Sequence, residues 1–456
     1  MKKKYLQQSA ALLLIVFGLA GCFKKTTTFA GPRNLTIYGV DNSDVIAPII
    51  AKYKDRQSDA VIKYKKFSTI EELEKLVINE VAEGEGPDIF YIPNGWLPRN
   101  NKKIVPLVSE SLTPEAFGQV FVGVTSGDFI QTDVNDGVRK IYALPLFVDT
   151  LALYYNKTHF EQEIPERGAP AATWAEAVKD AEVLRKDDLN LSLSRGEIAM
   201  GGGTITYAPD ILYNLFLQAG SNLYDDQYKQ ISLNAGAVKQ FQLFMSFSDP
   251  KAKNFSWDPI QSAGKTNPAE LEAFLSGKIS SMFAYSDLAA RLENEIKNVK
   301  TRSDAIVSIK DIAIAPSPQM STDDTKKAVY ANYYGLAVSR NSKNAALAWD
   351  FVQFATSKDS ASSYIKKTKR PTARRDLIET QKKDATLKVF LDQLGMAQSI
   401  RFFSKQVTDQ TLRDAIRTAQ ETDNEQAALS KAGTLLQEAF KLEMPQGLFP
   451  KPAVKK

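Results

Sequence analysis

Hydrophobic residues recur with two different periods along the first part of the chain, and the two periods alternate. Short apolar runs at residues 35–40, 61–64 and 89–92 have the composition and length of buried strands. Between them, apolar side chains recur every three or four residues over 46–53 and 70–81, the spacing of one helix face. Alternating strands and helices predict an α/β fold with a βαβ arrangement.

The chain begins with the pattern of an exported lipoprotein. Three lysines at positions 2–4 precede an apolar run at 10–20, which is too short to span a bilayer and leads through small residues to Cys22. Cys22 is the single cysteine, and it stands where a bacterial lipobox places the residue that is lipidated. We therefore predict a signal peptide at 1–21, a tether at 22–32 and a lipid anchor on the extracytoplasmic face of the cell membrane.

The mature chain is long and nearly neutral. Removal of residues 1–21, which contain three lysines and no acid, leaves 435 residues and lowers the formal charge from +5 to +2. That length exceeds what one hydrophobic core usually fills, so at least two lobes are expected. The charge gives no broad electrostatic reason to expect nucleic-acid binding. No apolar stretch after Cys22 has the length of a membrane span, so the rest is expected outside the membrane.

Four segments resemble, in the same order, the elements of one protein family. Residues 83–90 carry a Gly-x-Gly-Pro-Asp-apolar signature, and 142–157 resemble a crossover strand between two lobes. Residues 273–282 match a Phe-x-x-Gly-x-x-x-x-Met element, and 334–351 join a strand to an apolar helix face. Together they resemble the bacterial extracellular solute-binding proteins, the maltose-binding-protein-like receptors of ABC importers.

The resemblance implies a periplasmic-binding-protein-like fold, in which hinge crossover strands join two α/β lobes and the ligand lies in the cleft between them. It implies lobe one at 33–148 plus 314–356, lobe two at 150–312 plus 357–450, and a basic tail at 451–456. A ligand that contacts both lobes binds the closed state better and shifts the population towards it. The implied function is a monomeric receptor that captures a small solute, by family default a sugar or oligosaccharide, for ABC permease subunits.

Candidate ligand-binding residues follow from the same resemblance. Asp149 resembles the family's acidic crossover residue that hydrogen-bonds sugar hydroxyls, with a hinge-stabilising surface acid as the alternative. Tyr285 lies where the family carries an aromatic platform. Asp41 follows the first strand, where ligands of open α/β sheets tend to bind, although a helix cap explains it equally well. The full set is Asp41, Asn42, Asn94, Trp96, Asp149, Tyr207, Tyr285, Ser286 and Tyr334.

Other functions are weighed against the receptor. His159 is the only histidine, which argues against histidine-based zinc sites and nucleophile triads, and we predict neither a metal nor a cofactor. The same fold with a peptide, polyamine or anion as ligand, or with a sensor as partner, is one alternative. A lipid-anchored glycan hydrolase that uses two carboxylates is the less favoured one, and we predict that the protein is not an enzyme. Residues 376–456 have helical periodicity but match no family element.

Overall fold

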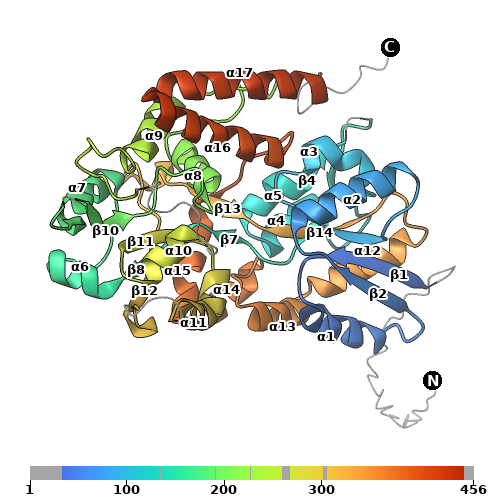
Figure 1. Cartoon of the computed structure of the whole chain (residues 1–456). Coiled ribbons are helices and arrows are strands. Elements are labelled where there is room, and N and C mark those ends of the chain that lie inside the picture. The colour runs from blue at the N-terminus through green and yellow to red at the C-terminus, as the bar shows by residue number, and fades with distance from the viewer. Residues whose placement is uncertain are drawn as a thin grey trace, which may run out of the picture.

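The computed structural model describes residues 33–445 apart from positions 134, 191, 226, 259–267 and 301–305. It consists of two α/β lobes that lie side by side (Figure 1). The predicted signal peptide, the tether with Cys22 and the basic tail fall outside the described residues. Among the helices that are described, none combines the length and apolar character needed to cross a membrane.

The first lobe is built on a five-stranded sheet. Its strands are β1 (Asn34–Gly39), β2 (Val61–Lys66), β3 (Ile89–Pro93), β6 (Leu144–Pro145) and β14 (Tyr334–Val338). They are ordered β2-β1-β3-β14-β6, with β1, β2 and β3 parallel as the alternating pattern predicts and β14 antiparallel to its neighbours. The associated helices and the short hairpin are α1 (Ser43–Lys54), α2 (Ile70–Ala82), α3 (Leu97–Asn100), α4 (Pro114–Val120), α5 (Gly123–Phe129), β4 (Ile130–Thr132), β5 (Arg139–Ile141), α12 (Ala345–Ala355) and α13 (Lys358–Thr368).

The second lobe contains another five-stranded sheet, ordered β12-β8-β11-β10-β9. Its strands are β8 (Ala152–Asn156), β9 (Lys186–Asp187), β10 (Leu193–Ile198), β11 (Ile279–Ala284) and β12 (Ile312–Pro316). The central strand β11 is buried at every position, because helices and loops cover both faces of this sheet. The helices of this part of the chain are α6 (Lys157–Glu163), α7 (Trp174–Leu184), α8 (Ala208–Gln218), α9 (Ala235–Ser246), α10 (Ala269–Leu275) and α11 (Asp287–Lys300).

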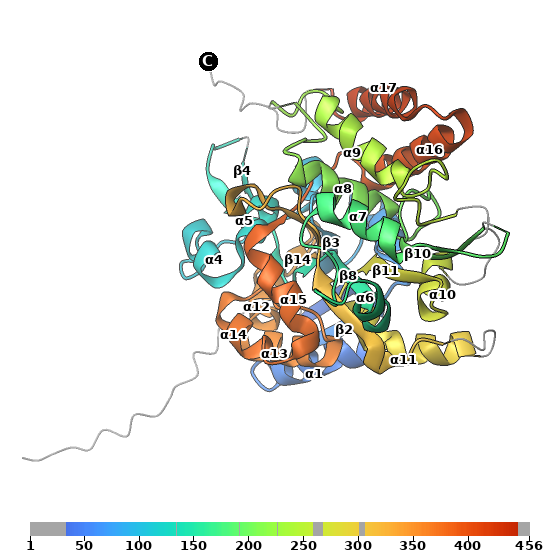
Figure 2. The ribbon, with the colours of Figure 1, turned by 90° about the vertical axis from the view of Figure 1, so that its left-hand side faces the viewer.

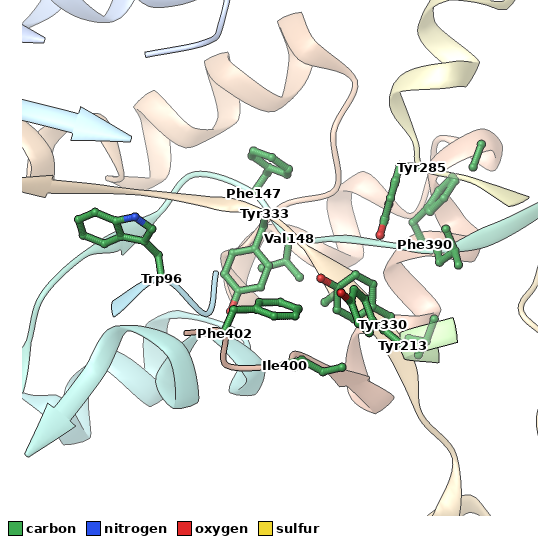
Figure 3. Packing of buried hydrophobic residues seen from close by; sticks show 14 of the residues in the cluster. Trp96, Phe147, Val148, Tyr213, Tyr285, Tyr330, Tyr333, Phe390, Ile400 and Phe402 are labelled. Atoms are coloured by element: carbon green, nitrogen blue, oxygen red, sulfur yellow. The ribbon is translucent and has the colours of Figure 1, made fainter. Parts of the chain in front are cut away.

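A small three-stranded sheet joins the lobes. It contains β7 (Asp149–Thr150), β13 (Val329–Asn332) and β15 (Ala397–Gln398), with β13 in the middle. Aromatic side chains pack around it: Tyr330 of β13 lies against Tyr213 of α8, with ring centroids 5.3 Å apart (Figure 3). Because short strands with a dense aromatic core connect the lobes, we describe this sheet as the hinge.

The lobe boundaries after the hinge differ from the expected ones. We expected lobe one to resume at 314, but β12 pairs along its length with β8 in the second sheet. We expected lobe two from 357, but α13 packs against α1 of the first lobe. The apolar pattern of β12 predicts a strand without specifying its partner, and the pattern of α13 does not specify which lobe buries its apolar face. The chain then passes through α14 (Ile378–Gln381) to α15 (Ala385–Gln393), which packs against β12.

The C-terminal stretch that matched no family element forms a helical hairpin of α16 (Lys405–Thr422) and α17 (Glu425–Glu443). Leu412 and Ile416 on one face of α16 are fully buried, while charged residues occupy the other faces. The hairpin covers α8 and α9 of the second lobe (Figures 1 and 2). This packing brings the beginning of α16 to the space between the lobes.

Candidate ligand-binding cleft

A cavity of about 540 Å³ lies between the lobes, within the size range of small-molecule sites. The first-lobe wall consists of one face of α2 with residues from the ends of β3 and α3. The second-lobe wall consists of the beginning of α8 and the first half of α16. The lining residues are Ile70, Glu71, Glu74, Lys75, Ile78, Asn79, Pro93, Arg99, Thr206, Pro209, Asp210, Asn332, Tyr334, Ser404, Lys405, Gln406, Asp409, Gln410 and Arg413.

The α2 wall combines polar side chains with Ile70 and Ile78, while other apolar residues of this helix face the core. Leu73 and Val77 are buried, whereas Glu71 and Glu74 border the cavity. The hydroxyl of Thr69 caps the helix by accepting a backbone N–H from its first turn at 3.2 Å. The cap fixes where the helix begins and therefore which face of it borders the cavity.

Trp96 lies behind Glu74 rather than in the cavity lining. The indole N–H of Trp96 donates to Oε1 of Glu74 at 2.8 Å, and its ring packs edge to face on Phe90. Burial raises the pKa of Glu74 above its ordinary value, while the Trp96 N–H and the nearby Arg99 oppose the shift. Trp96, which is only 6% exposed, therefore orients a lining carboxylate.

The second-lobe wall contains a buried charge cluster around Lys405. Its ammonium group donates to Asp409 at 2.7 Å and to Asp210 at 3.2 Å. The hydroxyl of Tyr285 donates to the other oxygen of Asp210 at 2.9 Å, and that of Tyr213 to the other oxygen of Asp409 at 2.6 Å. Burial works against the charge on Lys405, but the two carboxylates outweigh it and raise the pKa of this lysine.

Asp149 and Ser286 meet at the hinge. The Asp149 carboxylate accepts the Ser286 hydroxyl at 2.5 Å and the Ser286 backbone N–H at 3.0 Å, and its other oxygen accepts the Thr150 N–H at 2.9 Å. Burial raises the pKa of Asp149 to about 7, although the Ser286 hydrogen bonds favour the ionised form. Asp149 thus makes a hinge contact, as in the alternative, but it is buried and does not lie at the surface.

Asp41 belongs to a buried network at the end of β1. Its carboxylate accepts the hydroxyls of Tyr91 and Tyr364 and forms an ion pair with Arg370, each at 2.9 Å. The guanidinium of Arg370 lies over the ring of Phe147, 4.3 Å from its centroid. With three partners already present, Asp41 has a structural role in this arrangement.

The remaining predicted residues lie at varied distances from the cavity. Asn42 is exposed and accepts a hydrogen bond from Lys66. Asn94 is buried, and its amide group bonds the backbone of the hinge at Ala331 and Tyr333. Tyr207 packs edge to face on Tyr285, with centroids 5.1 Å apart, so that Tyr285 is covered where a stacking platform was expected.

Of the predicted residues, Tyr334 lines the cavity. Trp96 and Tyr285 do not line it, but each donates a hydrogen bond to a lining carboxylate: Trp96 to Glu74 and Tyr285 to Asp210. The sequence pattern did not single out Glu74 or Lys405. The polar face of α2, opposite the apolar residues of its helical pattern, offered a signal for Glu74. For Lys405 there was none, because its position depends on how the C-terminal hairpin packs.

Two lobes with a cavity of mixed polarity between them define a class of proteins that bind a small solute by closing one lobe onto the other. The family model described as bacterial extracellular solute-binding protein matches residues 44–362, which is more than half of the chain. The protein therefore belongs to this family, and the predicted family, two-lobed fold and receptor class are confirmed.

Curated relatives and solved structures agree with this assignment. The chain is 24% identical to binding proteins of Brucella abortus and Brucella suis over 297 residues, which are 63% of this chain and 62% of theirs. It thus matches less than two thirds of the length of these relatives.

The structural comparisons extend over most of the chain. A cyclo/maltodextrin-binding protein complexed with maltotetraose has a TM-score of 0.69 at 17% identity and covers 91% of this chain and 99% of its own. The sugar-binding protein MalE from Xanthomonas citri has a TM-score of 0.68 at 16% identity, with coverages of 89% and 96%. An ABC substrate-binding protein from Listeria monocytogenes in complex with cycloalternan has a TM-score of 0.67 at 14% identity, with coverages of 89% and 98%. At such low identities, these TM-scores and coverages establish a shared fold.

Proposed function

We propose that the protein is a lipid-anchored receptor that captures a sugar or oligosaccharide outside the membrane and delivers it to an ABC permease. The observation that carries the proposal is the cavity of about 540 Å³ with walls from both lobes. A solute held there contacts α2 and α16 at once, so it stabilises the closed arrangement relative to an open one. The permease then distinguishes loaded from empty receptor by the lobe arrangement.

The lining of the cavity suits a ligand rich in hydroxyl groups. Asn79, Gln406 and Gln410 offer amide donors and acceptors, and the neighbouring carboxylates accept hydroxyl protons. The ring of Tyr334 gives an apolar surface for the face of a sugar ring. The named ligands of the structural relatives, maltotetraose and cycloalternan, are carbohydrates, which supports the same ligand class here.

We infer binding without catalysis. A glycan hydrolase needs one carboxyl group that donates a proton and a second that acts as nucleophile or base. Asp210 and Asp409, the carboxylates of the second-lobe wall, are both bound by Lys405 and by a tyrosine hydroxyl. Both are therefore engaged by the protein itself. The other lining acids, Glu71 and Glu74, lie on the same helix rather than on two sides of a substrate.

The first test is a thermal-shift and calorimetric screen of residues 24–456 against oligosaccharides, monosaccharides, peptides, polyamines and oxyanions. A ligand at one hundred times its dissociation constant adds about 2.7 kcal/mol of stability, which raises the melting temperature by several degrees. Gln410→Ala should weaken a carbohydrate that binds in the cavity, whereas Glu182→Gln, at an exposed position of α7, should not. A response to peptides or oxyanions alone would contradict the carbohydrate proposal while keeping the receptor.

Lipid anchoring has a separate test. Replacement of Cys22 by Ala removes the predicted acylation site, so the protein should move from the membrane fraction to the soluble fraction. Membrane association that persists in the Cys22→Ala variant would show that lipidation at this position is not the anchor.

A further inference from the structure

The charged side chains that line the cleft differ in how many hydrogen bonds and ion pairs they form with the rest of the protein. Its lining contains both acids and bases, and the bases of the second-lobe wall are already bound. Lys405 lies between two carboxylates, and Arg413 donates to the backbone carbonyls of Gly203, Ile205 and Thr206. These contacts hold both cations in place, so an anionic ligand would compete with the groups that already bind them.

Of the two cations that line the first-lobe wall, one is bound by the protein and the other is exposed to solvent. Arg99 forms an ion pair with Glu443 of α17 at 2.8 Å and donates to the carbonyl of Phe403. Lys75 is exposed and lies four residues after Glu71 on α2, a spacing at which opposite charges on a helix attract each other. Among the described lining residues, an anionic ligand would therefore meet this exposed lysine as the cation without a hydrogen bond or ion pair, and a single exposed charge contributes little to binding.

Glu74 differs from these groups. Its Oε1 accepts the Trp96 indole N–H, but its Oε2 has no hydrogen-bond partner among the residues that the structure describes. The carboxylate is partly buried at the cavity wall, where desolvation penalises its charge. A hydrogen-bonded cation from the ligand would compensate for that penalty, and it would do so more fully once the lobes exclude water.

We propose that the solute bound in this cleft carries a protonated amino group that Glu74 receives, so that the ligand class is an amino sugar or an amine-bearing oligosaccharide. This inference rests on the carbohydrate receptor proposed above and specifies its ligand. An ammonium donates charge-assisted hydrogen bonds to a carboxylate, which are roughly twice as strong as neutral ones. The amides of the opposite wall remain available for the hydroxyl groups of the same ligand.

The test is isothermal calorimetry of the mature chain at pH 6 with three ligand series of equal length: glucosamine oligomers, their N-acetylated forms and glucose oligomers. We expect the wild-type protein to bind the amine series on the order of tenfold more tightly than the acetylated series. Glu74→Gln keeps an oxygen for the Trp96 N–H, so it should fold normally and lose the preference. Glu182→Gln makes the same charge change at an exposed position of α7, outside the cavity lining, and should retain the preference.

The outcomes separate the two proposals. Equal binding of the amine and neutral series overturns the amino-group inference and leaves the carbohydrate receptor intact. A preference for the amine that survives in Glu74→Gln also overturns the role of this residue. Binding of none of the three series overturns the inference together with the carbohydrate function. If the preference for the amine series is lost in Glu74→Gln but kept in the control variant, the result supports Glu74 as the group that receives the ammonium.

Discussion

Replacement of Asp149 by Asn should increase the stability of the variant relative to the wild type as the pH rises. Asp149 lies in the hinge, is 3% exposed, and receives hydrogen bonds from Ser286 and Thr150. Burial is the main cause of its raised pKa, and Asp287 adds to it, whereas Arg370 opposes it. The wild-type hinge therefore carries an ionised group at neutral pH only at a cost in folding free energy.

The magnitude follows from the two pKa values. The pKa of Asp149 rises from an ordinary 3.8 to about 7 in the folded state. Because the folded state holds the proton of Asp149 to higher pH, the free energy of unfolding of the wild type falls as the pH rises from about 3.8 to about 7, the window between the two pKa values. At about 1.4 kcal/mol per pKa unit the penalty reaches about 4 kcal/mol. Below the window both states are protonated and the penalty vanishes, while above it both are ionised and the penalty is constant.

The assay is urea unfolding of wild type and Asp149→Asn in steps from pH 4 to pH 8. The free energy of unfolding of the variant minus that of the wild type should increase by about 4 kcal/mol across this range. A pH-independent offset of about 1–3 kcal/mol against the variant is expected, because its amide nitrogen cannot accept the hydrogen bonds that one carboxylate oxygen accepts. Ser286→Ala removes a donor to the ionised form and should move the transition to higher pH. A difference that stays constant within 1 kcal/mol from pH 4 to 8 would refute the reasoning.

Three further predictions concern the cleft and the contacts that support it. Lys405→Met leaves Asp210 and Asp409 without their shared cation and should cost about 2–4 kcal/mol in urea unfolding, a range reduced for the 27% exposure of the lysine side chain. Adding Asp210→Asn should recover part of this loss, and a loss below 1 kcal/mol would contradict the charge cluster. Gly95→Ala requires a side chain at φ +76° with its Cβ 2.3 Å from the carbonyl oxygen of Ile400, and should lower stability by at least about 2 kcal/mol. Gly84→Ala is the matched control, because Gly84 has φ +88° but no atom near the added Cβ. An equal loss of stability in both variants would mean that the backbone conformation, and not the contact with Ile400, causes the effect. Trp96→Phe removes the N–H that holds Glu74 and should weaken ligand binding by roughly threefold to tenfold with little change in melting temperature, measured by calorimetry beside thermal unfolding.

Local features of the fold were accessible from the sequence where one helix or strand could be considered by itself. The strand and helix boundaries from β1 to β3 follow from periodicity and capping, and Thr69 caps α2 as its side chain allows. The family signatures supplied the two-lobed arrangement. The sheet that β12 joins and the lobe that α13 covers were predicted wrongly, since an apolar strand or helix face fits more than one partner.

The candidate site shows the same division. Tyr334 was named from its position before a strand, but Trp96 and Tyr285 proved to lie behind lining carboxylates, since an aromatic residue in a loop can either face the cavity or orient a neighbour. The sequence by itself determined the export signal pattern, the secondary structure of the first lobe and the family, because these depend on neighbouring residues and short motifs. Only the tertiary structure decided that Glu74 and Lys405 line one cavity, since more than three hundred positions separate them and only the packing of the C-terminal hairpin on α8 and α9 brings them together.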